Sequence, residues 1–154
     1  MDKSFDCMHI PMMMEFSVLN RRFMETGFKP IARNYDLKLS DMSLLLLLYF
    51  NPKVNTAKDI AEYGELKRGN ISVIVEDLSK RGLIVQVPNE DDRRVKTLVL
   101  TDACTGIIDD CKDVLERMLE ITFKGISAEQ LENCEKVFMK MYENMKANFN
   151  QENS

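Results

Sequence analysis

Cationic, amide and hydroxyl side chains gather at two places near the middle of the sequence. They are Lys67, Arg68, Asn70 and Ser72, followed further along by Asp92, Arg93 and Arg94. Lysine and arginine contact phosphates, arginine also pairs with guanine, asparagine pairs with adenine, and a small hydroxyl contacts either a base or a phosphate. These residue types predict noncovalent binding to duplex DNA, with Arg68 and Asn70 as the base-reading residues.

Two helices joined by a turn are expected to carry the first group. Thr56 is a suitable N-cap for a helix over residues 56–63, which Gly64 ends. Over residues 67–81 apolar side chains recur every three or four positions, and Gly82 follows as a left-handed stop. The pattern predicts a helix-turn-helix whose second helix presents its early polar residues.

A β-hairpin is expected to carry the second group. Residues 83–87 and 95–100 are rich in β-branched side chains and flank a polar loop over residues 88–94. Residues 53–55 are a candidate for a short third strand. The arginines would therefore lie at an exposed hairpin tip.

This order of elements resembles a winged helix-turn-helix, and its details resemble the MarR family of bacterial transcription regulators. The most specific part is the hairpin, or wing, where Asp92-Arg93-Arg94 precedes a strand and residues 100–102, Leu-Thr-Asp, open a long helix. The resemblance implies that one of the arginines enters the DNA minor groove and that Asp92 braces the pair. Arginine suits a narrow groove of enhanced negative potential.

The second helix departs from the common pattern of the family. Many relatives have Ser and Thr early in this helix and Arg shortly after, whereas this chain has Gly69, Asn70 and Val73. These departures leave the preferred operator sequence open. Gly69 also weakens the helix start by up to ~1 kcal/mol relative to alanine, unless a close approach to backbone or phosphate requires it.

Helical segments are also expected before the helix-turn-helix. An apolar stripe predicts a long helix over residues 12–35, interrupted by a kink or break at Gly27 and Pro30. Ser40 is expected to cap a helix over residues 41–50. This helix is apolar on every side, which predicts a place at the centre of the core.

Two further helices are expected after the wing. One covers residues 103–123 and ends at Gly125, and the next begins at a capping box formed by Ser127 and Gln130. Both carry long apolar stripes that a single chain would leave in water. An intertwined homodimer of terminal helices, which is also the architecture of the family, would cover them.

The predicted fold class is mainly α with a small β wing, a winged helix-turn-helix flanked by N- and C-terminal dimerisation helices. A chain of 154 residues suits one compact domain. Within this fused unit, residues 1–39 are expected to form the N-terminal dimerisation region, residues 40–101 the DNA-binding lobe and residues 102–154 the C-terminal dimerisation helices.

The net charge of −4 does not exclude nucleic acid, because the acidic residues are unevenly placed. Residues 51–101 carry nine Lys or Arg against eight Asp or Glu, whereas residues 102–154 carry six against eleven. DNA affinity depends on where the cations face phosphates, and a dimer would double the local basic surface.

No membrane or secretory segment is predicted. The longest apolar run, residues 42–50 interrupted by Ser43, is well short of the roughly 20 residues that span a bilayer. The N-terminus does not resemble a secretory signal, so a cytoplasmic location is expected.

Neither a cofactor nor a metal is predicted. Cys104, Cys111 and Cys134 are interpreted as small core residues, and the four cysteines lack the paired short spacings of a disulfide framework or zinc site. A nucleophilic pair of Cys7 and His9 lacks an evident third group to orient it, which argues against an enzyme. Redox sensing by Cys7 is retained as an alternative, although neighbouring Asp6 would raise the thiol pKa.

A ligand-binding surface is a further candidate at the start of the first helix. By resemblance, regulators of this family often respond to small aromatic or lipophilic effectors, and Met12, Met13 and Phe16 offer adaptable apolar contacts. The competing interpretation is that these side chains belong to the core or a dimer contact.

The leading functional hypothesis is a homodimeric, sequence-specific binder of double-stranded promoter DNA, acting as a ligand-responsive repressor on an inverted-repeat operator. The alternatives are a protein-interaction module whose winged-helix dimer has lost DNA affinity, or a redox-sensing regulator that uses Cys7. The acidic surface and Val73 favour the protein-interaction module slightly.

Overall fold

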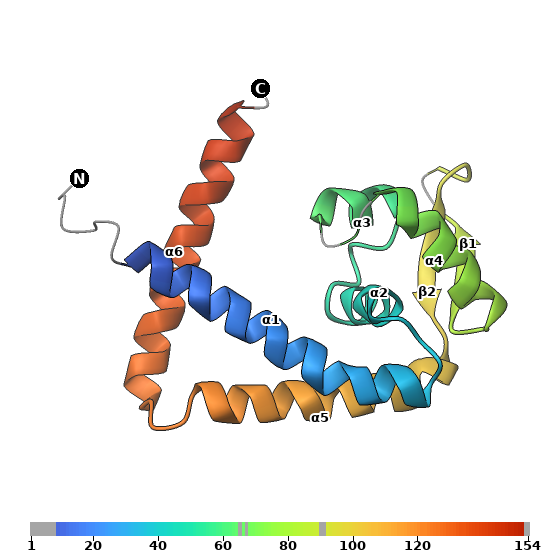
Figure 1. Ribbon diagram of the computed structural model, residues 1–154. Coiled ribbons are helices and arrows are strands. Elements are labelled where there is room, and N and C mark those ends of the chain that lie inside the picture. The colour runs from blue at the N-terminus through green and yellow to red at the C-terminus, as the bar shows by residue number, and fades with distance from the viewer. Residues whose placement is uncertain (1–8, 65, 67, 90–91, 153–154) are drawn as a thin grey trace. The chain divides into compact units, whose positions relative to one another are not determined.

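The computed structural model describes residues 9–64, 66, 68–89 and 92–152. The chain forms two compact units, residues 1–118 and 119–154. The fold is mainly helical with one small two-stranded sheet, as the sequence predicted. In chain order the elements are α1 (His9–Asn34), α2 (Leu39–Phe50), α3 (Ala57–Tyr63), α4 (Arg68–Lys80), β1 (Ile84–Pro88), β2 (Lys96–Leu100), the 3-10 helix η2 (Asp102–Cys104), α5 (Thr105–Thr122) and α6 (Ala128–Glu152) (Figure 1).

The apolar helix α2 lies at the centre of the first unit, as its composition predicted. Its side chains Met42, Leu44 and Leu45 are almost completely buried. The C-terminal part of α1 and the first turns of α5 lie on one side of α2, and α3, α4 and the sheet lie on the other (Figure 1). This single core holds the helix-turn-helix against the longer helices.

The beginnings of α2 and α3 use the same device, in which a carboxylate three residues into the helix satisfies a free backbone N–H. Asp41 Oδ2 accepts from the backbone N–H of Lys38 at 2.8 Å. The expected cap at Ser40 is therefore wrong, because α2 already begins at Leu39 and Lys38 is its N-cap residue.

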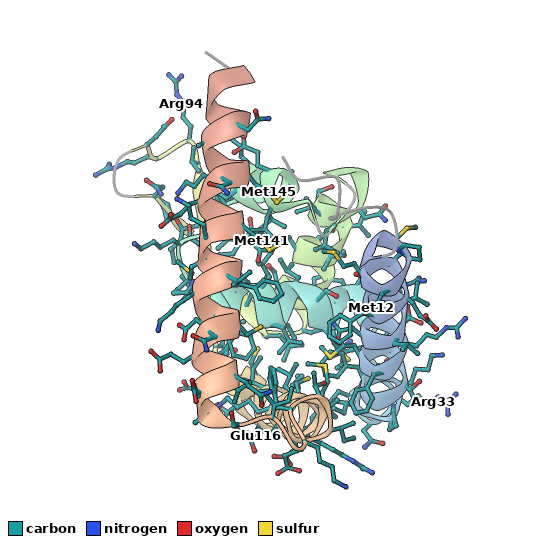
Figure 2. The ribbon with its side chains drawn as sticks, turned by 90° about the vertical axis from the view of Figure 1, so that its left-hand side faces the viewer. Met12, Arg33, Arg94, Glu116, Met141 and Met145 are labelled. Carbon is teal, nitrogen blue, oxygen red and sulfur yellow. The ribbon has the colours of Figure 1, made fainter. Side chains whose placement is uncertain are left out.

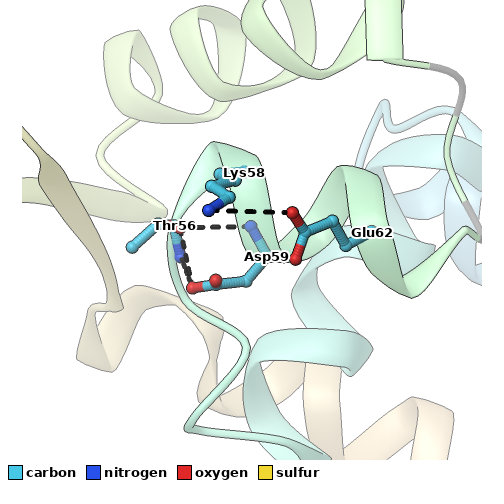
Figure 3. A network of polar contacts seen from close by, with 4 residues as sticks. All are labelled: Thr56, Lys58, Asp59 and Glu62. Carbon is cyan, nitrogen blue, oxygen red and sulfur yellow. Dashed lines mark hydrogen bonds and ion pairs between the residues drawn. The ribbon is translucent and has the colours of Figure 1, made fainter. Parts of the chain in front are cut away.

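The predicted cap of α3 is confirmed. Thr56 Oγ1 accepts from Asp59 N at 3.2 Å, while Asp59 Oδ2 accepts from Thr56 N at 3.2 Å and from the Thr56 hydroxyl at 2.7 Å (Figure 3). On the exposed side, Lys58 Nζ lies 3.8 Å from Glu62 Oε1. The helix ends at Gly64, whose φ of 85° lies in the left-handed region.

Of the kink or break expected at Gly27 and Pro30, the break did not occur: α1 runs through both residues to Asn34. A proline inside a helix removes one backbone hydrogen bond and crowds the preceding turn, at a cost of about 3 kcal/mol. Phe28, Ile31 and Ala32 are buried on both sides of Pro30, and this packing offsets the cost.

Antiparallel strands β1 and β2 form the wing, with Ile84 opposite Leu100 and Pro88 opposite Lys96. The predicted third strand is reduced to one isolated bridge between Thr56 and Thr97, next to a 2.8 Å hydrogen bond from Leu98 N to Asn55 O. The segment turns into α3 at this point, so the pairing cannot extend.

Helix α6 belongs to the second unit and begins at the predicted capping box. Ser127 N donates to Gln130 Oε1 at 2.9 Å and Gln130 N donates to Ser127 Oγ at 3.2 Å. Met141 and Met145 lie one turn apart on this helix and are exposed (Figure 2). The sequence interpretation of Cys134 as a core residue is wrong for the single chain, because Cys134 is exposed on α6.

Among the described helices, none is both long and apolar enough to cross a bilayer.

Candidate nucleic-acid interface

Helix α4 has one buried and one exposed face. Ile71, Ile74 and Leu78 are buried against the core, as their spacing predicted. Gly82 ends the helix with φ of 69°, and Leu83 N donates to Leu78 O at 3.0 Å to close the last turn. The helix is thereby held along its length, and its opposite face is left open.

The exposed face of α4 contains several of the predicted DNA-binding residues. Asn70 and Ser72 are exposed near the start of the helix, and Val73 is 62% exposed. Lys67 lies outside the described residues, as does the side chain of Arg68, whose backbone begins α4. The described part of this face can offer an amide, a hydroxyl and an apolar group to a ligand.

A cavity of about 410 Å³ lies where α4 meets the start of α3 and the wing. Its lining combines polar, cationic and apolar side chains, which are Thr56, Ala57, Lys58, Ser72, Val75, Glu76, Gln86, Arg94, Val95, Lys96 and Leu98. We call this cavity the wing groove. It brings together Ser72 and Arg94, two residues that the sequence assigned to separate groups.

Sequence reasoning did not assign five polar residues of the wing groove to the site, which are Thr56, Lys58, Glu76, Gln86 and Lys96. Lys58 lies in the first turn of the capped helix α3, and Lys96 lies two positions after Arg94 at the start of β2. The sequence carried a signal for each lysine, because Lys58 closely follows an N-cap residue and Lys96 lies close to the arginine pair. Only the packing of α3 beside the wing shows that they share one groove.

The wing tip is organised by backbone hydrogen bonds to Asp92. Its Oδ1 accepts from Arg94 N at 2.9 Å, and its carbonyl oxygen accepts from Val95 N at 2.9 Å. Asp92 therefore restrains the backbone from which Arg94 projects, and Asn89 Oδ1 accepts from Asp92 N at 3.4 Å. Arg93 and Arg94 are both exposed.

Among the described residues, Glu76 is the carboxylate that lines the wing groove, and it forms an ion pair with Lys80. Lys80 Nζ lies 2.7 Å from Glu76 Oε1 on the next turn of α4. The hydrogen bond from Lys80 lowers the pKa of Glu76, and the same bond raises the pKa of Lys80. The pair reduces the repulsion that an isolated Glu76 would exert on an anion in the groove.

A sequence model of the MarR family matches residues 35–95, which run from the end of α1 to the wing. This part of the chain is therefore similar in sequence to the winged helix of that family. No curated protein sequence matches the chain at a significant level.

Solved structures that share the MarR winged-helix fold cover most of this chain. The S. aureus MepR–DNA complex is 18% identical with a TM-score of 0.64, and the match covers 84% of this chain and 93% of that chain. A MarR protein from Peptoclostridium difficile is 18% identical with a TM-score of 0.68, covering 89% of this chain and 88% of that chain. The regulator MarR from Oenococcus oeni is 20% identical with a TM-score of 0.61, covering 85% and 98%. These likenesses show a common fold.

A second cavity has a volume of about 670 Å³ and lies between α1 and α2, with Leu115 of α5 in its wall. Its lining mixes apolar and polar side chains, which are Asn20, Arg21, Met24, Glu25, Phe28, Leu39, Ser40, Ser43, Leu46, Leu47, Phe50, Asn51, Tyr63, Leu66 and Leu115. The predicted effector contacts Met12, Met13 and Phe16 are exposed on earlier turns of α1 and do not line this cavity.

The cysteines of the MarR-type fold differ in their surroundings. Burial raises the pKa of the Cys104 thiol and raises that of Cys111 to about 11. Both thiols are therefore protonated at neutral pH, in agreement with their predicted place in the core. Cys7, the candidate redox residue, lies outside the described residues.

Proposed function

We propose that this protein is a sequence-specific binder of double-stranded promoter DNA that regulates transcription, acting in the cytoplasm as a homodimer on an inverted-repeat operator. The observation that supports this most directly is the wing groove, which places three cations beside the open face of α4. No covalent chemistry is part of the proposal, in keeping with the noncovalent contacts that these residue types make.

The wing groove suits a DNA phosphate backbone. Lys58, Arg94 and Lys96 approach it from α3 and from the wing, while Ser72 reaches it from α4. If α4 enters the major groove and the wing reaches the adjacent minor groove, the strand between them passes over these side chains. The cations would fix the register of the helix on the duplex.

Each predicted site residue has a distinct role in this proposal. Arg68 and Asn70 would contact base edges, and the residues expected to contact phosphate or to support the wing are Lys67, Ser72, Asp92, Arg93 and Arg94. Because Asp92 holds the backbone of Arg94, the wing arginine would be positioned before DNA arrives.

Exposed apolar side chains support the homodimer. On α6, Val137, Phe138, Tyr142 and Met145 are each about 60% exposed. In the other unit, Phe16 and Leu19 of α1 are exposed by more than half. A second copy of the chain would remove such surfaces from water. The boundaries proposed for the dimerisation regions are residues 1–39 and 102–154.

A small aromatic or lipophilic effector is proposed to bind in the cavity between α1 and α2. The protein would repress transcription when no effector is bound. Phe28 and Leu47 offer apolar contacts there, and Asn20 and Arg21 offer hydrogen-bond donors that would orient a polar substituent. An effector in this cavity would contact α1 and α2, which adjoin the helix-turn-helix through the core.

Selection of bound sequences from a random duplex DNA pool at near-physiological salt tests the proposal. The wild type should enrich an inverted repeat with half-sites about one helical turn apart. The double variant Lys58→Ala/Lys96→Ala should bind the selected duplex more weakly and with a shallower salt dependence, because each lost phosphate contact removes about 0.9 from the slope of log K against log salt.

A matched control is Lys53→Ala, which removes an exposed lysine that does not line the wing groove. Its salt slope should equal that of the wild type. No enrichment of any sequence by the wild type, or equal slopes for all three proteins, would contradict the proposal.

The protein-interaction module is the second candidate, and the exposed Val73 on α4 favours it. It would be supported by a wild type that shows no salt-dependent affinity for any duplex. A redox-sensing regulator that uses Cys7 is a third candidate, and loss of peroxide sensitivity of DNA binding in Cys7→Ser would support it.

A further inference from the structure

We propose that Val73 reads the 5-methyl group of thymine in the major groove, next to a base pair contacted by Asn70. The inference rests on the proposed DNA-binding function and deepens it by naming a specificity-determining residue. It accounts for an apolar side chain that is 62% exposed in the single chain.

The position of Val73 on α4 comes from the buried face of the helix. Ile71, Ile74 and Leu78 fix which side faces the core, with exposed fractions of 2%, 6% and 0%. Val73 is 62% exposed and lies three residues after Asn70, so both side chains belong to the open face. A helix in the major groove would present this face to the base edges.

The chemistry of the base edges selects the partner. In the major groove, adenine, guanine and cytosine present hydrogen-bond donors and acceptors, whereas thymine also presents a methyl group. A valine has no polar atom to pair with the other edges, and it would leave their donors and acceptors unsatisfied. Contact with a thymine methyl removes apolar surface of both partners from water.

Gly69 supports a close approach at the same place. It lies one turn before Val73, it is exposed, and a Cβ built on it would meet no atom of the chain within 4 Å. Packing inside the protein therefore does not require glycine here, although glycine weakens the helix start. An uncovered backbone beside Val73 lets this turn of α4 come near the base edges.

The flanking charges agree with this orientation. Ser72 and Glu76 of α4 line the wing groove beside Lys58, Arg94 and Lys96. A phosphate backbone seated on those cations would follow the side of α4 that carries Ser72 and Glu76, with Val73 beside it and Asn70 further around the open face. The apolar contact would then fall on the bases rather than on the backbone.

Uracil substitution tests the proposal, because deoxyuridine lacks only the thymine methyl group. Each thymine of the selected duplex is replaced in turn, and dissociation constants are measured for the wild type and for Val73→Ala. For the wild type, deoxyuridine at one position in each half-site should raise the dissociation constant about fourfold, the value expected for one buried methyl group.

Val73→Ala should bind the thymine and deoxyuridine duplexes with nearly equal affinity at that position. Val99→Ala is the control, because Val99 is an exposed valine on the wing, and it should keep the wild-type ratio. Equal thermal midpoints would show that both variants are folded.

The proposal is overturned if Val73→Ala keeps the wild-type ratio of dissociation constants for the deoxyuridine and thymine duplexes. It is also overturned if deoxyuridine weakens wild-type binding at no thymine position. These results differ from failure of the proposed function, in which the wild type enriches no duplex at all. The proposal is also overturned if Val73→Ala leaves the affinity for DNA unchanged and instead weakens binding to a partner protein.

Discussion

The guanidinium of Arg81 donates to the carbonyl oxygen of Tyr35, and this bond joins the end of α4 to the end of α1. A second donor of Arg81 reaches the carbonyl oxygen of Asp36, which has a left-handed φ of 51°. The Tyr35 hydroxyl in turn donates to Asp110 Oδ2 of α5 at 3.0 Å. Helix α4 is thus tied to a junction that α1 and α5 share.

Arg81→Ala should lower both the stability of the lobe and its affinity for DNA. Loss of the two bonds should reduce the free energy of unfolding by about 1 kcal/mol, a modest value because the side chain is exposed. Urea denaturation and DNA titration measure the two effects. Arg33→Ala is the control, since Arg33 is an exposed arginine in the last turn of α1. Equal DNA affinity for both variants would show that Arg81 does not position α4.

Gly27→Ala should destabilise the packing of α1 on α5. A Cβ on Gly27 would overlap Cγ1 of Val114, and overpacking costs about 1–3 kcal/mol. Urea denaturation should show the loss. Gly27→Ala should cost less stability in a Val114→Ala background than in the wild type, because the overlapping methyl group is then gone. Strictly additive effects would contradict a direct clash.

Gly69→Ala is expected to separate stability from binding. With no neighbour near the added Cβ, alanine should raise the free energy of unfolding by up to about 1 kcal/mol through its better helix propensity. DNA affinity should nevertheless fall if the bare backbone approaches the bases. Thermal unfolding and DNA titration of the same protein sample check both parts. A more stable variant with unchanged DNA affinity would show that the backbone of Gly69 does not come close to the bases.

Thr56→Ala should destabilise the start of α3 by about 1 kcal/mol, because the hydroxyl caps Asp59 N and donates to the Asp59 carboxylate. Thr56→Ser keeps both bonds and should retain most of the stability. Urea denaturation compares the three proteins. If alanine and serine gave the same loss, the effect would come from the methyl group rather than from the cap.

Alkaline pH should destabilise the core through Cys111. Burial raises its pKa from 9.0 to about 11. The folded state therefore holds the thiol proton more tightly than the unfolded state, so this contribution to stability is complete below pH 9.0 and is lost as the pH rises toward 11. Denaturant unfolding at several pH values should show a smaller alkaline loss for Cys111→Ala than for the wild type. Tyr35→Phe controls for the tyrosine, whose pKa is raised chiefly by its bond to Asp110.

The sequence by itself determined the order and type of the elements in the winged helix. Side-chain period and caps act over a few residues, so Thr56, Gly64 and Gly82 mark helix ends that the structure confirms. The buried face of α4 followed from the same short-range pattern. Where a local preference competed with burial, as at Pro30, the helix continued and the break that the sequence allowed did not form.

Tertiary structure alone decided which distant residues meet. Lys58 reaches the wing groove beside Arg94, Arg81 reaches Tyr35, and Gly27 lies against α5. These contacts join residues far apart along the chain, and they form because α1, α3, α4 and α5 each contribute apolar side chains to one core with α2. Local periodicity predicts that such faces will be buried, but the partner of each face follows only from the packing of all of them around one core.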